Sequence, residues 1–329
     1  MRNTLLLLAV ILVGCEKTSD IEPSSTFRFT DSPVVMGALS TDGNLTALVT
    51  SAQNIQVWEN TLKTKVLEIA SGTIRGDLVD ILLSKDNALL VTANARQVAF
   101  WDVATNEKIE EHFLSGAGQF AKIRGLALSD DSTRLAVGFS DGSVTTLVRK
   151  GKGLKTYQVH SKSVDHLYFN PQGNQLLTAG DDGKVRRWAF NSGKVVEEHK
   201  FDKSISSLAV DKRFNKFFAS GVMKKQQIVH LASSESPSDL SYAKRFKWFR
   251  TAVFVEGTPL LVTASPTSEI TGWHGRKGDE LSSWKIDGSD DDVKVLDIGM
   301  YDNDHLYSLS SEGVLESWNL RPMMAASLN

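Results

Sequence analysis

Cysteine is almost absent from this chain of 329 residues. The single one, Cys15, leaves no partner for an internal disulfide and excludes a metal cluster built on several cysteines. An excess of one charge is also missing, because 37 Lys and Arg residues balance 39 Asp and Glu residues, for a formal net charge of −2. General nucleic-acid binders normally carry a basic excess, so we expect no nucleic-acid partner. With 41% hydrophobic and 23% charged residues, the composition is that of a folded protein.

The N-terminal hydrophobic run is too short to cross a membrane. Residues 5–13 form nine consecutive apolar residues after Arg2. Nine helical residues span roughly 13 Å at about 1.5 Å each, whereas the hydrocarbon core of a bilayer is ~30 Å thick. The run therefore has the length of a signal-peptide hydrophobic region rather than that of a transmembrane helix.

This run ends in Leu12-Val13-Gly14-Cys15, which resembles the lipobox of bacterial lipoproteins. The resemblance implies that residues 1–14 are a signal peptide and that Cys15 becomes the lipidated first residue. The polar residues 15–25 then form a flexible tether. Glu16, standing where an Asp would favour the inner membrane, favours the outer one. We thus expect a bacterial cell-envelope protein, lipid-anchored and facing the periplasm from the outer membrane.

A repeat of about 43 residues fills the rest of the chain. A β-branched or leucine residue, two further residues and a closing Trp or Leu recur seven times, with steps of 43, 46, 41, 43, 42 and 45 residues. The closing residues are Trp58, Trp101, Leu147, Trp188, Leu231, Trp273 and Trp318. Upstream of most of them, two short apolar strands flank a turn such as Asp42-Gly43 or Pro171-Gln172-Gly173. The pattern predicts meanders of short strands and an all-β fold.

These units resemble WD40 repeats, although Trp101-Asp102 is the sole literal Trp-Asp pair. The resemblance implies a single seven-bladed β-propeller of four-stranded antiparallel blades over residues 26–320. It also implies a hydrogen-bonded structural tetrad, made of His160, Thr178, Asp182 and Trp188. In the family the Asp accepts from the His, the hydroxyl relays the bond, and the Trp indole N–H ends the chain.

Ring closure is predicted from the two ends of the repeat region. After Trp318 only a tail of residues 321–329 remains, interrupted by Pro322, so the seventh unit has three strands. The alternating segment Thr26–Thr30 has the pattern of an edge strand. We predict that it pairs with Leu315–Asn319 and closes a monomeric ring.

Motifs for catalysis or cofactor binding are not found. The seven histidines form no His-x-x-x-His or His-Glu-x-x-His pattern, and no Gly-x-Ser-x-Gly elbow or phosphate loop occurs. We expect no enzyme activity, no cofactor and no metal. The acidic run Asp290-Asp291-Asp292 is interpreted as a solvated loop, with a Ca²⁺ site as the alternative.

Two features indicate a binding surface. The segment 244–250 combines four cations with three aromatics, among them Trp248, and either binds a partner or packs between blades five and six. In WD40-like rings, residues that enter the innermost strand surround one mouth of the central channel. Six cations are predicted to form a positive collar there: Arg75, Arg124, Lys162, Lys203, Arg250 and Lys294.

The function favoured by these observations is a non-catalytic, membrane-anchored scaffold that binds other proteins of the bacterial envelope. Two alternatives stay open. One is an outer-membrane assembly lipoprotein of the quinoprotein-like propeller type, and the other is a propeller hydrolase. Fold resemblance alone does not separate them.

Overall fold

The computed structural model of the chain describes residues 21–151, 153–222, 225–242, 248–288 and 292–328. It contains seven four-stranded antiparallel sheets, which we call blades 1 to 7. Blades 1 to 3 consist of β2 (Val34–Leu39), β3 (Leu45–Thr50), β4 (Ile55–Glu59), β5 (Thr64–Ile69); β6 (Leu78–Leu83), β7 (Leu89–Asn94), β8 (Gln97–Asp102), β9 (Lys108–Phe113); and β10 (Ile123–Leu128), β11 (Arg134–Phe139), β12 (Ser143–Val148), β13 (Leu154–Gln158). Blades 4 to 6 consist of β14 (Val164–Phe169), β15 (Gln175–Gly180), β16 (Lys184–Ala189), β17 (Val195–Lys200); β18 (Ile205–Val210), β19 (Lys216–Gly221), β20 (Gln226–His230), β21 (Ser238–Asp239); and β22 (Thr251–Phe254), β23 (Leu260–Ala264), β24 (Glu269–His274), β25 (Glu280–Lys285). Blade 7 consists of β26 (Val295–Met300), β27 (His305–Ser310), β28 (Val314–Asn319) and β1 (Ser25–Arg28).

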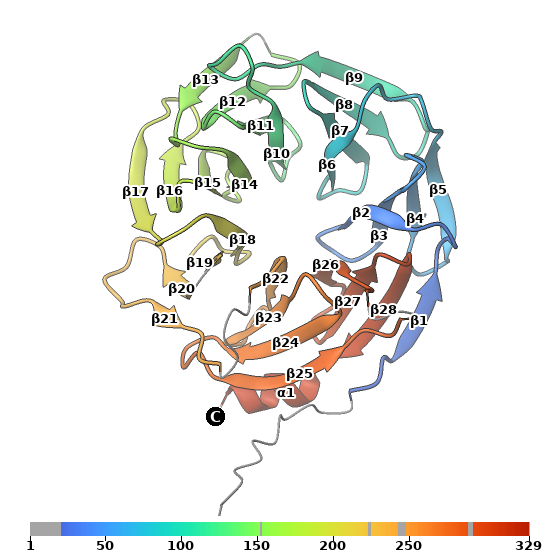
Figure 1. The fold of residues 1–329 in the computed structure, drawn as a ribbon, viewed down its shortest axis with the longest axis vertical. Coiled ribbons are helices and arrows are strands. Elements are labelled where there is room, and N and C mark those ends of the chain that lie inside the picture. The colour runs from blue at the N-terminus through green and yellow to red at the C-terminus, as the bar shows by residue number, and fades with distance from the viewer. Residues whose placement is uncertain (1–20, 152, 223–224, 243–247, 289–291, 329) are drawn as a thin grey trace, which may run out of the picture.

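The blades stand in chain order around a central axis, as Figure 1 shows, and the first strand of each blade lies innermost. The predicted seven-bladed propeller is thereby confirmed. We call the face where the innermost strands begin the entry face and the opposite one the exit face. Each blade buries apolar side chains against both of its neighbours, because a single four-stranded sheet cannot cover its own two faces.

The ring is closed by the N-terminal strand, as predicted. β1 pairs antiparallel with β28, and the register joins Ser25 to Ser317 and Phe27 to Leu315. Phe29, just beyond the strand, donates its backbone N–H to Gly313 O at 2.8 Å. The pairing is one residue shorter than the predicted segments and begins one residue earlier on each strand. It supplies the strand that blade 7 lacks.

Most closing tryptophans lie beside an irregularity in the fourth strand of their blade. The register shifts immediately before Trp58, Trp101, Trp188 and Trp273. The extra residue of each bulge lies on the fourth strand, opposite the tryptophan. The indoles of the last three tryptophans are buried between blades. Blade 5 corrects one sequence assignment: Leu231 lies just beyond β20, and pairing with Phe217 puts Val229 at the position of Trp188. The 43-residue spacing misplaced this residue by two positions because the turns differ in length between blades.

The buried indoles of the closing tryptophans are matched by hydroxyl groups on the second strand. Trp101 donates to Thr92, Trp273 to Thr263 and Trp318 to Ser308, over 3.0, 2.8 and 2.9 Å. Where Leu147 or Val229 replaces the indole, the register puts Val137 or Ala219 in place of the hydroxyl. The paired replacement leaves no buried hydroxyl without a partner at these positions.

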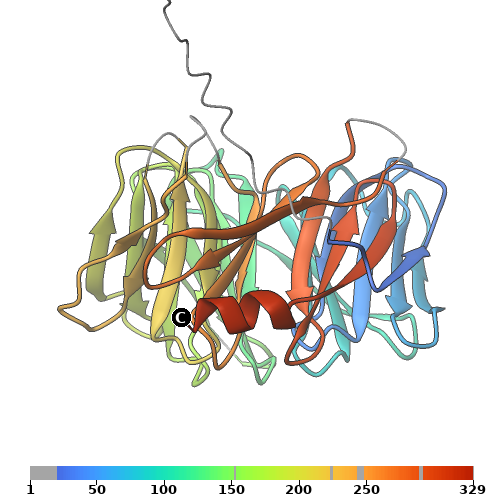
Figure 2. The ribbon, with the colours of Figure 1, turned by 90° about the horizontal axis from the view of Figure 1, so that it is seen from below.

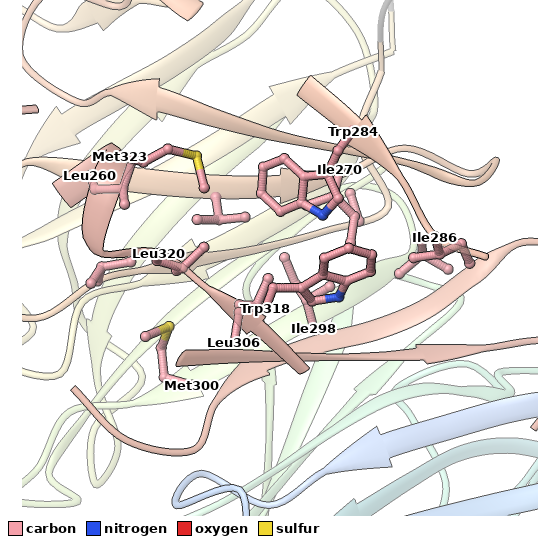
Figure 3. Close-up of a cluster of buried hydrophobic side chains, with 14 of the residues drawn as sticks. Leu260, Ile270, Trp284, Ile286, Ile298, Met300, Leu306, Trp318, Leu320 and Met323 are labelled. Carbon is pink, nitrogen blue, oxygen red and sulfur yellow. The ribbon is translucent and has the colours of Figure 1, made fainter. Parts of the chain in front are cut away.

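Residues 321–329, predicted as a C-terminal tail, contain a helix, α1 (Arg321–Ser327). It lies along the outside of the propeller, as Figure 2 shows. Pro322 occupies its first turn, where the missing N–H costs no helical hydrogen bond. Met323 is 4% exposed and packs in the core beside Leu320 and Trp318, as Figure 3 shows. Gly272 makes room for it, since a Cβ there would lie 2.7 Å from the Met323 sulfur. Within the described ranges, no helix has the length and apolar character needed to span a bilayer.

Candidate functional site

The four residues of the predicted tetrad form one hydrogen-bonded chain in blade 4. The Trp188 indole donates to Thr178 Oγ1 over 3.1 Å, and Thr178 Oγ1 lies 2.8 Å from His160 Nε2. His160 Nδ1 lies 3.0 Å from Asp182 Oδ1. Because Asp182 accepts, the ring proton is on Nδ1, and Nε2 accepts the Thr178 hydroxyl.

Hydrogen bonds keep the Asp182 carboxylate of this chain ionised. Burial raises the pKa of Asp182, but hydrogen bonds from His160 and from the backbone N–H groups of Ser161 and Lys184 outweigh it and hold the pKa at about 2. His160 and Thr178 are buried. A fully satisfied buried network fixes one geometry, here linking the loop before β14 to strands β15 and β16. The tetrad therefore has a structural role and presents no group to a substrate.

The six predicted collar cations are all exposed, and each lies at or just before an innermost strand. They do not share one position, however. Arg124 and Arg250 occupy one position relative to their strands, and Lys162 and Lys203 share another position three residues earlier. Lys294 and Arg75 come two and four residues before the position of Arg124.

Carboxylates interrupt the collar. Arg124 Nε lies 2.9 Å from Asp165 Oδ1, which is an ion pair between blades 3 and 4. The exposed Asp77, Asp202 and Asp292 are within two residues of collar cations in the sequence. The entry face thus carries mixed charge rather than an unbroken positive ring.

Trp248 and Phe249 separate the two interpretations of the basic aromatic segment. Phe249 is 1% exposed and packs against Trp273 and Phe218, with ring centres 5.8 and 5.9 Å apart. Trp248 is 48% exposed at the entry to β22. One aromatic packs between blades five and six, and the next one is presented to solvent. Residues 244–247 lie outside the described residues, as do Cys15, Asp290 and Asp291.

Two carboxyl groups near the central axis were not singled out from the sequence. Asp80 of β6 and Asp297 of β26 occupy equivalent bulge positions. Asp80 accepts the Leu126 N–H and Asp297 accepts the Leu39 N–H, each over 2.9 Å, so each ties its blade to the next one. Burial raises the pKa of Asp80 to about 7 and that of Asp297 to about 6. Aligning the repeats on the bulge would have revealed this shared position.

A group of possible metal ligands lies in the turn between β26 and β27. Ligand atoms of Asp302, Asp304 and His305 lie within 4.8 Å of one another. His305 Nδ1 is 2.9 Å from Asp302 and 2.8 Å from Asp304, and Arg321 forms an ion pair with Asp304. The carboxylates are thus occupied by cationic and N–H groups of the chain itself, and we assign this group a structural role.

Comparison with known proteins connects blade 4 to a family. Residues 151–189, which contain the tetrad, match the family described as WD domain, G-beta repeat. Protein groucho of Drosophila melanogaster is 29% identical over 129 residues, which are 39% of this chain and 17% of that protein. The WD repeat-containing protein 91 homolog of Dictyostelium discoideum is 29% identical over 103 residues, or 31% and 13% of the two chains. Transducin-like enhancer protein 2 of Mus musculus is 26% identical over 129 residues, or 39% and 16%. The chain thus matches less than a fifth of the length of each relative.

Among solved structures, a chain of the crystal structure of the Mitotic Checkpoint Complex superposes with a TM-score of 0.74. The superposition covers 95% of this chain and 99% of that one, at 16% sequence identity. At this identity the likeness concerns the fold alone. Residues 151–189 therefore match a WD40 repeat, and parts of the chain are similar to WD-repeat proteins.

Proposed function

We propose that the chain is a non-catalytic scaffold that binds a protein partner on its entry face and is held at a bacterial envelope membrane by lipid on Cys15. The observation that carries the docking proposal is the exposed Trp248, which stands beside Arg250 where β22 begins. A second exposed aromatic, Phe120, is 78% exposed in the loop that leads to β10 on the same face.

The chemistry of this face suits a protein partner. Trp and Arg dominate the binding energy of protein interfaces, because a large ring and a planar cation gain most from being desolvated. The alternating cations and carboxylates favour a partner surface that also carries both signs of charge. Arg250 supports such a contact, since no carboxylate of the described residues lies within 4.0 Å of its guanidinium.

Docking is tested in intact cells with a photo-crosslinking amino acid in place of Trp248. A second protein carries the same amino acid in place of Lys194, an exposed residue in the exit-face turn after β16. We expect a discrete protein adduct from position 248 that disappears when Arg250→Glu is added. Equal adducts from both positions, or an adduct at 248 that is insensitive to Arg250→Glu, would contradict the proposal.

The anchor is supported by the lipobox-like segment and by the place where the tether meets the ring. Ser25, ten residues after Cys15, begins the closing strand at the outer edge of blade 7. Growth with a radiolabelled fatty acid tests the anchor directly. Wild type should take up label and sediment with membranes, and Cys15→Ser should do neither. Label retained by Cys15→Ser would remove the lipid from the proposal and leave the docking face untouched.

A further inference from the structure

A groove on the exit face lies between blades 5 and 6, far from the residues proposed for docking. Its volume is about 700 Å³. Three turns line it, namely those after β18, after β22 and after β24, and the end of α1 completes it at Ser327 and Leu328.

Cations outnumber carboxylates along this groove. The basic lining residues are Lys212, Arg213, Lys216, Arg276 and Lys277, and the acidic ones are Asp211 and Glu256. Glu256 already pairs with Lys212 at 3.5 Å, and Asp211 Oδ1 accepts the backbone N–H groups of Asn215 and Lys216. No ion pair within 4.0 Å involves Arg213, Lys216 or Arg276 in the described part of the chain. The walls therefore present three cations that form no ion pair within 4.0 Å with the described residues.

Two of these cations, Lys216 and Arg276, line the groove from different blades. Lys216, from the start of β19, lies with its ammonium 4.7 Å from the centre of the Phe254 ring. Burial lowers the pKa of Lys216, the Asp211 carboxylate opposes this change, and the guanidinium of Arg276 adds to it. Like charges held close together are unfavourable, and an anion placed between them would relieve the repulsion.

His274 provides a hydrogen-bond donor in the same groove. Its side chain is buried, with 6% exposed, and its Nδ1 accepts the backbone N–H groups of Arg276 and Lys277 over 3.2 and 3.3 Å. With Nδ1 accepting, the ring proton sits on Nε2. No hydrogen bond of Nε2 occurs with the described residues, so this donor is left for an acceptor in the groove.

We infer that this groove binds an acidic peptide segment of a partner protein, whose carboxylates lie between Arg213, Lys216 and Arg276. The cations come from two blades, so they suit an extended ligand with several carboxylates rather than one compact anion. Leu328, 69% exposed, offers an apolar contact for a side chain between the carboxylates. A nucleic acid would need basic surface well beyond the groove, whereas the chain as a whole has a net charge of −2. The site goes beyond the function proposed above and shares no residue with the entry face.

The test uses the full-length chain in detergent and a fluorescein-labelled peptide that alternates glutamate pairs with leucine. Fluorescence anisotropy measures its binding to wild type, to Arg213→Glu/Arg276→Glu and to the milder Arg213→Gln/Arg276→Gln. The matched control is Lys150→Glu/Lys194→Glu, which makes the same change in net charge at exposed exit-face turns of blades 3 and 4. Circular dichroism checks that each variant is folded.

We expect the Glu pair to raise the Kd at least about tenfold, the Gln pair to raise it less, and the control pair to change it less than about twofold. Affinity for wild type should also fall between about 50 mM and about 500 mM salt. Three results would overturn the inference. They are equal binding by the groove and control variants, equal binding of a peptide with glutamine in place of glutamate, and failure of wild type to bind the acidic peptide while it binds an oligothymidylate or phosphatidylglycerol vesicles.

Discussion

Truncating Phe29 tests whether the chain ends hold the ring closed. Phe29 is 7% exposed, and its ring centre lies 5.1 Å from that of Phe27 and 5.4 Å from that of Trp58. Phe29 thus joins the N-terminal segment to blade 1 as well as to blade 7. Phe29→Ala loses the transfer free energy of a buried ring and leaves a cavity, which together cost about 3–5 kcal/mol. For a chain of this size, that corresponds to a fall in Tm of about 4–7 °C.

The matched control is Phe113→Ala in β9, because Phe113 is 75% exposed. Its removal should change stability by less than about 0.5 kcal/mol. Thermal unfolding followed by circular dichroism gives both Tm values under the same conditions, and hydrogen exchange locates the weakened region. In Phe29→Ala, we expect protection of backbone amides from exchange to fall first in β1 and β28, because the Phe29 side chain holds their pairing in place. Protection in blade 4 should fall later.

Equal Tm values for the two variants would refute the assignment of Phe29 to the closure. Loss of protection that begins in blade 4 would refute the reasoning even if the Tm fell as expected. Blade 4 contains the satisfied tetrad and lies across the ring from the closing strand (Figure 1), so it should be the last region to respond.

Further predictions concern the buried polar groups. The pKa of Asp80 is raised to about 7, so the folded state binds the proton more tightly than the unfolded chain does. The resulting contribution to the free energy of unfolding is fully present below about pH 4 and is lost as the pH rises through 7. The free energy of unfolding of wild type should therefore rise by about 2 kcal/mol from this group between pH 8 and pH 5.5. Asp80→Asn should abolish that part of the pH dependence, as measured by denaturant unfolding at each pH. An unchanged pH dependence would contradict the assignment. Thr178→Val leaves both His160 Nε2 and the Trp188 indole without a hydrogen-bond partner and should lower the free energy of unfolding by about 2–4 kcal/mol. Thr92→Val leaves only the Trp101 indole without a partner and should cost about half of that. Equal losses of stability in calorimetry would show that the hydrogen bond to His160 adds nothing.

Much of the fold follows from the sequence because each blade repeats a local pattern. The spacing of Trp58, Trp101 and Trp188 reports the length of one blade, and the alternation around Phe27 reports an edge strand. Both patterns depend on near neighbours, which a single sequence records well. Blade 5 is the exception, because its third strand carries Val229 at the position where the other blades have Trp or Leu.

The candidate sites were harder to predict, because they depend on contacts between blades. Arg124 is paired with Asp165, which lies 41 residues away on the next blade, and spacing within the repeat does not reveal such a contact. Within its own strand Asp80 is an ordinary polar residue. Its structural role depends on accepting the Leu126 N–H of blade 3. The exit-face groove unites turns of two blades with the end of α1, a helix too short to show an apolar period.

The place of β1 in the last blade has a consequence for folding during synthesis. Ser25 and its partner Ser317 are 292 residues apart, so a ribosome that adds about 5–20 residues per second needs roughly 15–60 s to deliver the partner after the first strand is made. During this interval the unpaired edge of the nascent strand β1 can pair with strands of other chains. A holding chaperone, or export before folding, therefore benefits this protein more than one whose first strand pairs with its immediate successor.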